Sequence, residues 1–183
     1  MKSKALLMKR TFAYFVFFAF ALISFSACKK DSGSISGGGD YYMKFKRDGK
    51  EIKMTYTPQA LFADVSSIGL YNGTFEAFTS DGKTTMILII YDPSPVAAGK
   101  TYTQDYLSTA SLPQAQLAYT DETTTGYSSG STILNPDAST TVSISDRTDT
   151  YIKGTFSGKL LTSDYKGIKY NITDGEFYLK IVK

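Results

Sequence analysis

The chain has 183 residues, with 20 Lys and Arg against 17 Asp and Glu, one Cys, no His and no Trp. The lack of histidine excludes Ser-His-Asp triads, histidine bases and histidine metal sites. A single cysteine excludes internal disulfides and cysteine-clustered zinc or iron–sulfur sites. From residue 28 onward, 16 basic and 17 acidic side chains nearly balance, which is unlike the basic surface of a nucleic-acid-binding protein.

The first 27 residues have the pattern of a secretory signal peptide. Four basic residues lie between Lys2 and Arg10, and the apolar run from Phe12 to Ile23 follows them. This run is shorter than the roughly 20 residues that a bilayer-spanning helix needs. Small residues, Ser26 and Ala27, then mark a cleavage site. We therefore expect residues 1–27 to be removed; the alternative is a signal anchor that is never cleaved.

Cys28 follows these small residues, and the segment Ser26-Ala27-Cys28 resembles the lipobox of bacterial lipoproteins. The resemblance implies that Cys28 becomes the new N-terminus and carries acyl chains such as palmitate, which anchor the protein to a membrane. Because Lys29 rather than Asp follows, it also favours the outer membrane, with either face open. A free cysteine behind an ordinary cleavage site is the alternative.

Residues 28–40 predict a tether between this anchor and the folded part. Lys29 to Asp40 is rich in Gly and Ser and has almost nothing to bury, which is typical of a flexible linker. Twelve residues of this kind have a root-mean-square reach of roughly 19 Å. We therefore expect a single folded domain over residues 41–183, held close to the bilayer.

The start of this domain predicts a β-hairpin with a defined register. Two strands of alternating polarity, 41–47 and 51–57, flank Asp48 and Gly49, a residue pair that two-residue hairpin turns favour. This turn pairs Arg47 with Lys50, and it therefore brings the apolar residues of the two strands onto one face. The resulting pairs are Phe45 with Ile52, Met43 with Met54, and Tyr41 with Tyr56.

Two further Asp-Gly pairs predict two more hairpins. Asp81 and Gly82 join a strand near 73–79 to the strand 84–91, whose centre is apolar on both faces and is therefore expected inside the sheet. Asp174 and Gly175 would form the turn of a closing hairpin that pairs Ile172 with Phe177, Tyr170 with Leu179, and Ile168 with Ile181.

Other segments complete an all-β prediction. Further strands are expected at 60–65, 116–120, 141–145 and 151–161. Gly154 and Gly158 share the inward face of the last of these, which suggests an aromatic ring from a neighbouring strand, with Tyr170 opposite Gly158. About nine or ten short strands favour an antiparallel two-sheet β-sandwich, and a closed, lipocalin-like β-barrel is the alternative.

The chemistry-bearing residues do not point to a defined active site, and we expect no enzyme, cofactor or metal. Without His, a hydrolase of envelope or extracellular glycans would need paired carboxylates, and most of these lie at turns. Glu76 and Glu176 lie in strands and are expected to face solvent. The nearest approaches to a calcium loop are Asp121 with Glu122 and the segment 146–149, but neither has the pattern of a dedicated loop.

Tyrosine is the remaining candidate for ligand contact, since it combines apolar area with a hydroxyl group. The registers above assign Tyr41, Tyr56 and Tyr170 to apolar faces, and hence to the core. The residues left for binding a glycan or a protein partner are in the loop-rich middle of the chain: Tyr102, Tyr106, Tyr119 and Tyr127.

The C-terminal part resembles small lipoproteins of Bacteroidota-type Gram-negative bacteria. The matching segments are Ile152 to Gly158, with its Gly-Thr-Phe core, and Ile172 to Phe177, with its Gly-x-Phe motif; residues 44–50 match more weakly. The resemblance implies a β-domain at the cell envelope and no known site residues. Taken together, the sequence predicts a lipid-anchored, non-catalytic binding or interaction module; the alternative is a carboxylate-based hydrolase.

Overall fold

The computed structural model describes residues 41–65, 69–103, 112–130 and 135–183, all within one compact unit, Gly39–Lys183. The predicted leader over residues 1–27, the tether over residues 28–40 with Cys28, and Tyr106 lie outside the described residues. The described residues contain strands and no helix, so the predicted all-β class is confirmed. Within this part of the chain, no helix is long and apolar enough to cross a membrane.

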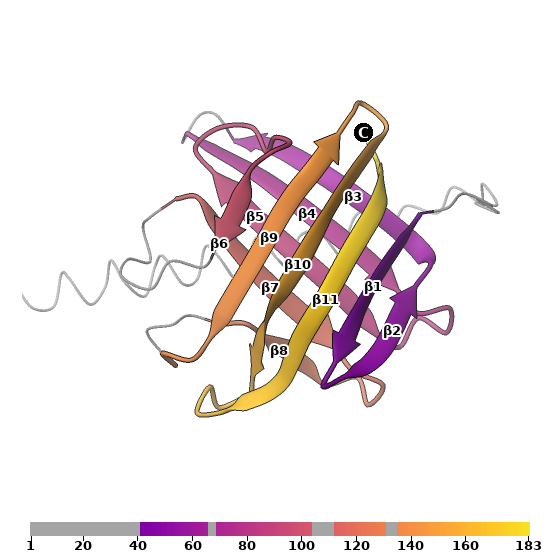
Figure 1. The fold of residues 1–183 in the computed structure, drawn as a ribbon, viewed down its shortest axis with the longest axis vertical. Helices are drawn as coiled ribbons and strands as arrows, with labels where there is room; N and C mark the ends of the chain where they lie inside the picture. Colours follow the sequence, from indigo (N-terminus) through magenta and orange to yellow (C-terminus); the bar gives the residue numbers. More distant parts are fainter. Residues whose placement is uncertain (1–40, 66–68, 104–111, 131–134) are drawn as a thin grey trace, which may run out of the picture. The chain divides into compact units, whose positions relative to one another are not determined.

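Eleven strands are present among these residues (Figure 1). They are β1 (Tyr42–Arg47), β2 (Lys50–Met54), β3 (Tyr56–Val65), β4 (Leu70–Phe78), β5 (Thr85–Asp92), β6 (Thr101–Thr103), β7 (Gln114–Thr120), β8 (Gly126–Ser128), β9 (Ser139–Arg147), β10 (Tyr151–Leu161) and β11 (Ile168–Ile181). The strands predicted at 60–65, 116–120, 141–145 and 151–161 correspond to β3, β7, β9 and β10.

The strands are hydrogen-bonded into one mixed sheet, not into two antiparallel sheets. Its order is β6-β9-β10-β11-β3-β4-β5-β7-β8, with β1 paired to β11 and β2 paired to β1. The parallel element is the contact between β11 and β3, which consists of two residue pairs, Lys180 with Gln59 and Ile181 with Ala60. The path ends at β6 and β8, so the sheet is not closed into a barrel.

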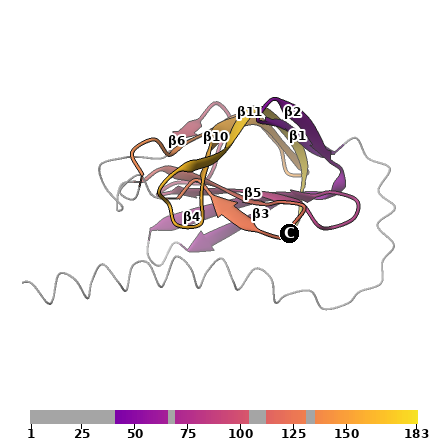
Figure 2. The ribbon, with the colours of Figure 1, turned by 90° about the horizontal axis from the view of Figure 1, so that it is seen from below.

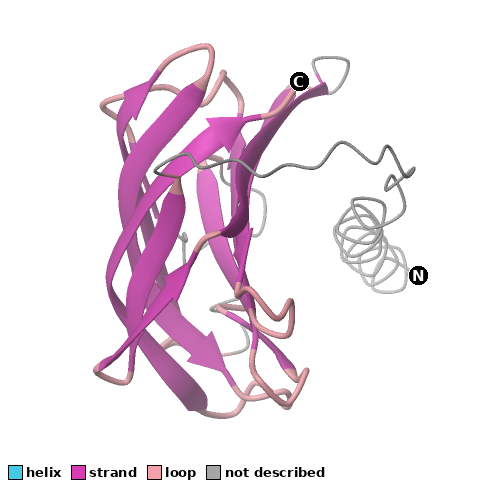
Figure 3. Cartoon of the chain, turned by 90° about the vertical axis from the view of Figure 1, so that its right-hand side faces the viewer, coloured by secondary structure: helices cyan, strands magenta, loops and turns pink. Residues whose placement is uncertain are grey.

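The sheet bends over a shared core (Figures 2 and 3). β9, β10, β11 and β1 lie over β3, β4, β5 and β7 (Figures 1 and 2). Aromatic side chains of the two halves contact one another in the core. Phe75 on β4 contacts Phe177 on β11, with ring centroids 5.3 Å apart. Phe45 on β1 contacts Tyr119 on β7 at 5.9 Å. Alternate residues of β4, β5, β9 and β10 are buried against the opposite half, as strand periodicity predicts.

The first predicted hairpin is confirmed, with its register from the turn to Met43 and Met54. The predicted pair of Tyr41 with Tyr56 is wrong, because β2 ends at Met54 and Tyr56 begins β3, where it lies opposite Phe78 of β4. Met43 pairs with Met54, Phe45 with Ile52, and Arg47 with Lys50. Asp48 and Gly49 have φ of 50° and 84°, the left-handed conformation that this two-residue turn needs. Met43, Phe45 and Met54 are buried, so the register places the apolar residues in the core.

The second hairpin is also confirmed, and its strand β5 is internal. β4 pairs with β5, with Phe78 opposite Thr85 at the turn end, and β7 pairs with the other edge of β5. Met86, Leu88 and Ile90 are fully buried on one face of β5, while Ile87 and Ile89 are half-buried on the other.

The third predicted hairpin is wrong, because residues 168–181 form one continuous strand. In β11, Ile172 pairs with Arg47 of β1 and Gly158 of β10, not with Phe177. Asp174 does have a positive φ, of 51°, but it and Gly175 form a bulge where the register shifts against both neighbours. A β-bulge can use the same left-handed residue as a tight turn. The dipeptide therefore sets the local backbone conformation without reversing the chain.

The two inward glycines of β10 do admit close neighbours, but Tyr170 is not opposite Gly158. A Cβ on Gly154 would lie 2.5 Å from Cζ of Phe177, so the aromatic ring covers Gly154. A Cβ on Gly158 would lie 2.6 Å from Cδ1 of Leu117, which belongs to the opposite half of the sheet. Both positions therefore require glycine because other parts of the core occupy the space.

Candidate functional site

The tyrosines predicted to bind a ligand do not form one exposed group. Tyr102 on β6 is fully buried, and its hydroxyl accepts a hydrogen bond from the amide of Ala97. Tyr119 on β7 is 2% exposed. Tyr127 on β8 is half-buried and packs edge-on against Tyr170, with ring centroids 5.1 Å apart. Of the described members, only Tyr127 offers ring surface to solvent.

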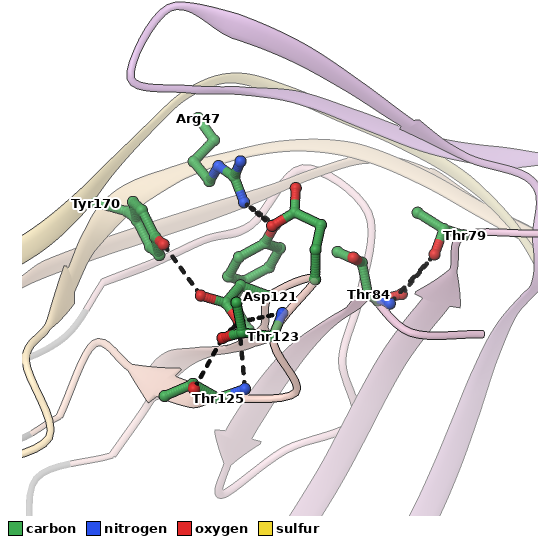
Figure 4. Close-up of polar contacts among 9 residues, drawn as sticks. Arg47, Thr79, Thr84, Asp121, Thr123, Thr125 and Tyr170 are labelled. Atoms are coloured by element: carbon green, nitrogen blue, oxygen red, sulfur yellow. Dashed lines mark hydrogen bonds and ion pairs between the residues drawn. The ribbon is translucent and has the colours of Figure 1, made fainter. Parts of the chain in front are cut away.

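Tyr119 belongs instead to a polar cluster between β1, β7 and β11, shown in Figure 4 and here named the Arg47–Asp121 cluster. Its members are Arg47, Tyr119, Asp121, Glu122 and Tyr170. Nη1 of Arg47 donates hydrogen bonds to Oη of Tyr119 at 2.7 Å and to Oε2 of Glu122 at 2.9 Å. The guanidinium also lies 5.0 Å from the ring centroid of Tyr170 and 5.7 Å from that of Tyr119. Such cation–π contacts favour a desolvated arginine.

Asp121 closes the loop between β7 and β8. Its Oδ1 accepts hydrogen bonds from the amides of Thr123 and Thr125 and from the hydroxyl of Thr123. Its Oδ2 accepts the hydroxyl of Tyr170 at 3.1 Å. The carboxylate is 4% exposed, so these four donors replace the water that it loses on folding.

These contacts keep each group of the cluster in its ordinary charge state. Burial opposes ionisation of Asp121, but the hydrogen bonds from Thr123, Thr125 and Tyr170 outweigh it and lower its pKa to about 2. The hydrogen bond from Arg47 lowers the pKa of Glu122. Burial raises the pKa of Tyr119 and of Tyr170 to about 12. A general acid or base needs a pKa near the working pH, and none of these four groups has one.

The cluster therefore connects β1, β7 and β11 through hydrogen bonds and an ion pair. Its hydrogen bonds are satisfied internally, and Arg47 joins an inward face of β1 to the start of the β7–β8 loop. Asp121 and Glu122 are adjacent in the sequence, but no local pattern indicates that Arg47 and Tyr170 lie beside them. Arg47 is 75 residues from its partner Glu122, and Tyr170 is 49 residues from its partner Asp121.

The segments considered for calcium have protein partners. Asp146 accepts a hydrogen bond from the hydroxyl of Tyr151 at 2.7 Å, and Asp121 has the four donors given above. No group of three or more Cys, Asp or Glu side chains within the described ranges is arranged to hold a metal ion.

A second site lies at the end of β9, where Arg147 stacks on an aromatic ring of the opposite half of the sheet. The guanidinium carbon is 3.9 Å from the ring centroid of Phe62 on β3. Nη1 donates a hydrogen bond to the carbonyl oxygen of Val96. Burial lowers the pKa of Arg147, but an arginine side chain stays protonated in proteins. The result is a cation in a partly desolvated position.

Arg147 lines an open groove of about 530 Å³, here named the Arg147 groove. A volume of this size is within the range of small-ligand sites. Its apolar walls are Phe62, Pro95, Ile181 and Val182, and its polar side chains are Arg147, Thr148, Asp149 and Lys183. None of the four ion pairs among the described residues involves Arg147.

Sequence reasoning missed this groove because its walls come from distant segments. The segment 146–149 is visible as a polar turn, but only the packing of β9 over β3 brings Phe62 beneath Arg147. Comparison with protein-family models, with curated proteins and with solved structures gives no match for this chain.

Proposed function

We propose that this chain is a lipid-anchored, non-catalytic binding module of the bacterial cell envelope. The leader over residues 1–27 and the lipobox-like segment at Cys28 support the anchor and favour the outer membrane. A compact β unit without a helix among its described residues supports a scaffold that presents a site at its edge. The Arg147 groove is the site that we assign to ligand binding.

The main support for this proposal is that the guanidinium of Arg147 is positioned by its neighbours but has no carboxylate partner among the described residues. Its guanidinium is stacked on Phe62, held at one nitrogen by the carbonyl of Val96, and not ion-paired with any described carboxylate. A guanidinium has five N–H donors in a planar fork, so donors remain for a ligand. Carboxylate groups match this fork and form two parallel hydrogen bonds with it.

The ligand that fits is therefore a carboxylate-bearing molecule with an apolar face. The carboxylate would lie against Arg147, and the apolar face against Pro95 and Val182. Thr148 would donate or accept a hydrogen bond, and Asp149 would accept one, at ligand hydroxyl or amino groups. An acidic sugar and a peptide with a free carboxylate both carry this chemistry, in keeping with the glycan or protein partner that the sequence predicts.

Calorimetric titration with four probes tests the proposal. The probes are a uronic-acid trisaccharide, its methyl-esterified form, a tripeptide with a free C-terminus, and the same tripeptide amidated. We expect binding of an acidic probe and loss of binding when its carboxylate is blocked. The sugar and peptide arms identify the source of the carboxylate; equal binding of the acidic and blocked forms would contradict the proposal.

Variants connect the binding to Arg147. Replacing a charge-assisted hydrogen-bond partner costs about 1.5–3 kcal/mol, so Arg147→Gln should weaken binding roughly 10- to 100-fold. Arg147→Lys keeps the charge but loses the planar fork, and it should bind with intermediate affinity. Lys166→Gln, at an exposed position in the loop between β10 and β11, is the matched control and should bind as the unmodified chain does.

No observation favours a hydrolase as a second function. Asp121 and Glu122 are the adjacent carboxylates on which such chemistry would draw. Both are engaged by donors, and both have lowered pKa values, whereas a general acid must hold a proton near neutral pH.

We also propose that the bent sheet is best described as a two-layer sandwich. Only two residue pairs of β11 and β3 connect its halves, whereas aromatic contacts such as Phe75 with Phe177 join them through the core. An experimental structure that lacks the pairing of Lys180 with Gln59 but retains both layers would support this description.

A further inference from the structure

Four tyrosines lie on the outer side of β10, β11 and the start of β1, and with three lysines of β1, β2 and β10 they form what we name the Tyr–Lys face. Its members are Tyr41, Tyr42, Tyr151, Tyr178, Lys44, Lys53 and Lys153. The ring centroid of Tyr178 is 4.7 Å from that of Tyr41 and 5.3 Å from that of Tyr151. In the register, Tyr42 of β1 lies opposite Tyr178, and Tyr178 lies opposite Lys153 of β10.

This face points away from the core. All four tyrosines are half-buried, whereas Met43, Ile152 and Phe177, which alternate with the strand residues Tyr42, Tyr151 and Tyr178, are buried. The prediction that Tyr41 belongs to the core is therefore wrong, as is the same prediction for Tyr56, which is 55% exposed. Tyr170 remains half-buried in the Arg47–Asp121 cluster.

The lysines lie over the tyrosine rings. Nζ of Lys153 is 4.4 Å from the ring centroid of Tyr178 and 5.1 Å from that of Tyr151. Nζ of Lys44 and of Lys53 lie 5.4 Å and 5.7 Å from the ring centroid of Tyr42. The rings therefore hold several ammonium groups on one surface.

Two acidic groups beside this surface, Glu176 and Asp146, already have partners, and Glu51 of β2 lies opposite Lys46 in the register. Glu176 accepts a hydrogen bond from the hydroxyl of Tyr42 and forms an ion pair with Lys44, and Asp146 accepts a hydrogen bond from the hydroxyl of Tyr151. Lys53 and Lys153 take part in none of the ion pairs among the described residues. The face therefore presents aromatic rings with two cations that can pair with an external anion.

The chain enters the fold at this face. Tyr41, the first described residue, packs on Tyr178, and only residues 29–40 separate it from Cys28. A linker of this length and composition has a reach of roughly 19 Å. If Cys28 carries the lipid, its tether leads directly to the Tyr–Lys face and gives this face a high effective concentration at the bilayer surface.

We propose that the Tyr–Lys face docks on the anionic headgroups of the membrane to which Cys28 anchors the chain; this inference rests on the anchor in the proposed function. Tyrosine is enriched at membrane–water interfaces, because its ring is apolar and its hydroxyl can remain in water. Lysines near an anionic surface are attracted to its headgroups. A soluble acidic polysaccharide would meet the same cations, but the tether favours the membrane.

The sequence offers a direct way to test this orientation. The chain has one cysteine and no tryptophan. A protein that begins at Cys28 retains the whole compact unit, and its thiol can be coupled to a maleimide-bearing lipid in vesicles. A single tryptophan then reports its distance from the bilayer through quenching by brominated lipids. Tyr178→Trp places the reporter on the Tyr–Lys face.

Tyr165→Trp is the matched control. Tyr165 is exposed, and it lies in the loop between β10 and β11, at the opposite end of these strands from Tyr178. In vesicles that contain phosphatidylglycerol, we expect strong quenching of Tyr178→Trp and weak quenching of Tyr165→Trp. In pure phosphatidylcholine vesicles, or at high salt, the difference should shrink because salt screens the lysines.

Lysine variants test the electrostatic part. Each lysine near an anionic surface is worth about 1 kcal/mol, so Lys53→Gln and Lys153→Gln should each weaken docking about fivefold. Lys83→Gln and Lys166→Gln, at exposed positions in loops, are the controls and should leave the quenching unchanged.

Equal quenching of the two tryptophan variants, or none at Tyr178→Trp, would overturn the inference. A change in Tyr178→Trp emission with a soluble uronate polymer, without lipid quenching, would also overturn it and assign the face to a polysaccharide. The chemical coupling makes this test independent of acylation in the cell. Its failure is thus distinguishable from failure of the proposed anchor or of binding in the Arg147 groove.

Discussion

The ring of Phe177 on β11 lies directly against the backbone of Gly154 on β10. A Cβ at residue 154 would be 2.5 Å from Cζ of Phe177 and 2.1 Å from the carbonyl oxygen of Ser143 on β9. Phe177 also contacts Phe75 of the opposite half of the sheet, with ring centroids 5.3 Å apart. The absence of a side chain at Gly154 therefore lets an aromatic ring connect the two halves of the core.

We predict that Gly154→Ala destabilises the protein by about 3 kcal/mol, the upper part of the usual range for overpacking, because one of the two close contacts is a backbone atom. Urea unfolding measures the change. Gly126→Ala on β8 is the control, since nothing lies within 4 Å of the added Cβ there. A similar free energy of unfolding for the two variants would contradict the packing.

A chain that ends at Asp174 should not fold cooperatively. Truncation there removes Phe177 and Leu179, which are 1% and 0% exposed, together with the pairing of β11 to β3. Full burial of each such side chain contributes about 1.5–3 kcal/mol, against a net stability of about 5–15 kcal/mol for a typical protein. Thermal unfolding monitored by circular dichroism compares residues 40–174 with residues 40–183. A cooperative transition of the shorter chain at a similar temperature would mean that the C-terminal half of β11 is dispensable.

Asp121 should make the stability depend on pH in the acid range. Because its folded-state pKa of about 2 lies below the unfolded value near 3.9, its stabilising contribution is complete above that value. The contribution is lost as the pH falls from about 4 to about 2. Urea unfolding of Asp121→Asn and the unmodified chain should therefore show a gap at pH 7 that narrows on acidification. Asp81→Asn, at an exposed turn, should show a smaller gap; a gap for Asp121→Asn that does not change with pH would be inconsistent with a lowered pKa.

Arg47 and Glu122 should contribute unequally, although they form an ion pair. Arg47→Ala leaves the buried hydroxyl of Tyr119 without its donor, and such a loss costs about 1–3 kcal/mol. Glu122 has an exposed side chain, so Glu122→Gln should cost less than about 1 kcal/mol. Chemical unfolding of both variants provides the comparison, and equal costs would mean that the ion pair, not the bond to Tyr119, stabilises the cluster.

The anchor has its own test. We predict that the mature protein begins at Cys28 and that this residue carries acyl chains. Each buried methylene contributes about 0.8 kcal/mol to membrane binding, and more than one chain makes anchoring stable. Intact-mass analysis of the envelope fraction measures both features. Retention of residues 1–27, or an unmodified thiol at Cys28, would disprove the prediction.

Local sequence patterns were sufficient for the first hairpin. Asp48 and Gly49 specify a turn, and alternation in both flanking strands leaves one register that buries Met43, Phe45 and Met54 together. The same logic located the strands β3, β7, β9 and β10, because period-two alternation needs no knowledge of the partner strand. It also placed β5 inside the sheet, from its apolar residues on both faces.

Long-range pairing decided what local patterns left open. Asp174 and Gly175 have the sequence of a hairpin turn. However, β1 pairs with one edge of β11 and β10 with the other, so residues 168–181 continue as one strand with a bulge at this dipeptide. The burial of the tyrosines also depends on distant partners. Tyr119 is covered by Arg47, which is more than 70 residues away in the sequence, whereas Tyr41 packs against Tyr178 on the outer side of the sheet.

The sequence by itself determined the all-β class, the position of most strands and the register of the first hairpin, because these depend on neighbours a few residues apart. Only the tertiary structure placed Phe62 beneath Arg147 and Tyr178 beside Tyr41 and Tyr151. A dipeptide or an alternating strand restricts the backbone locally. The order of the strands and the bend of the sheet decide which side chains come into contact. Both features depend on contacts distributed over the whole domain.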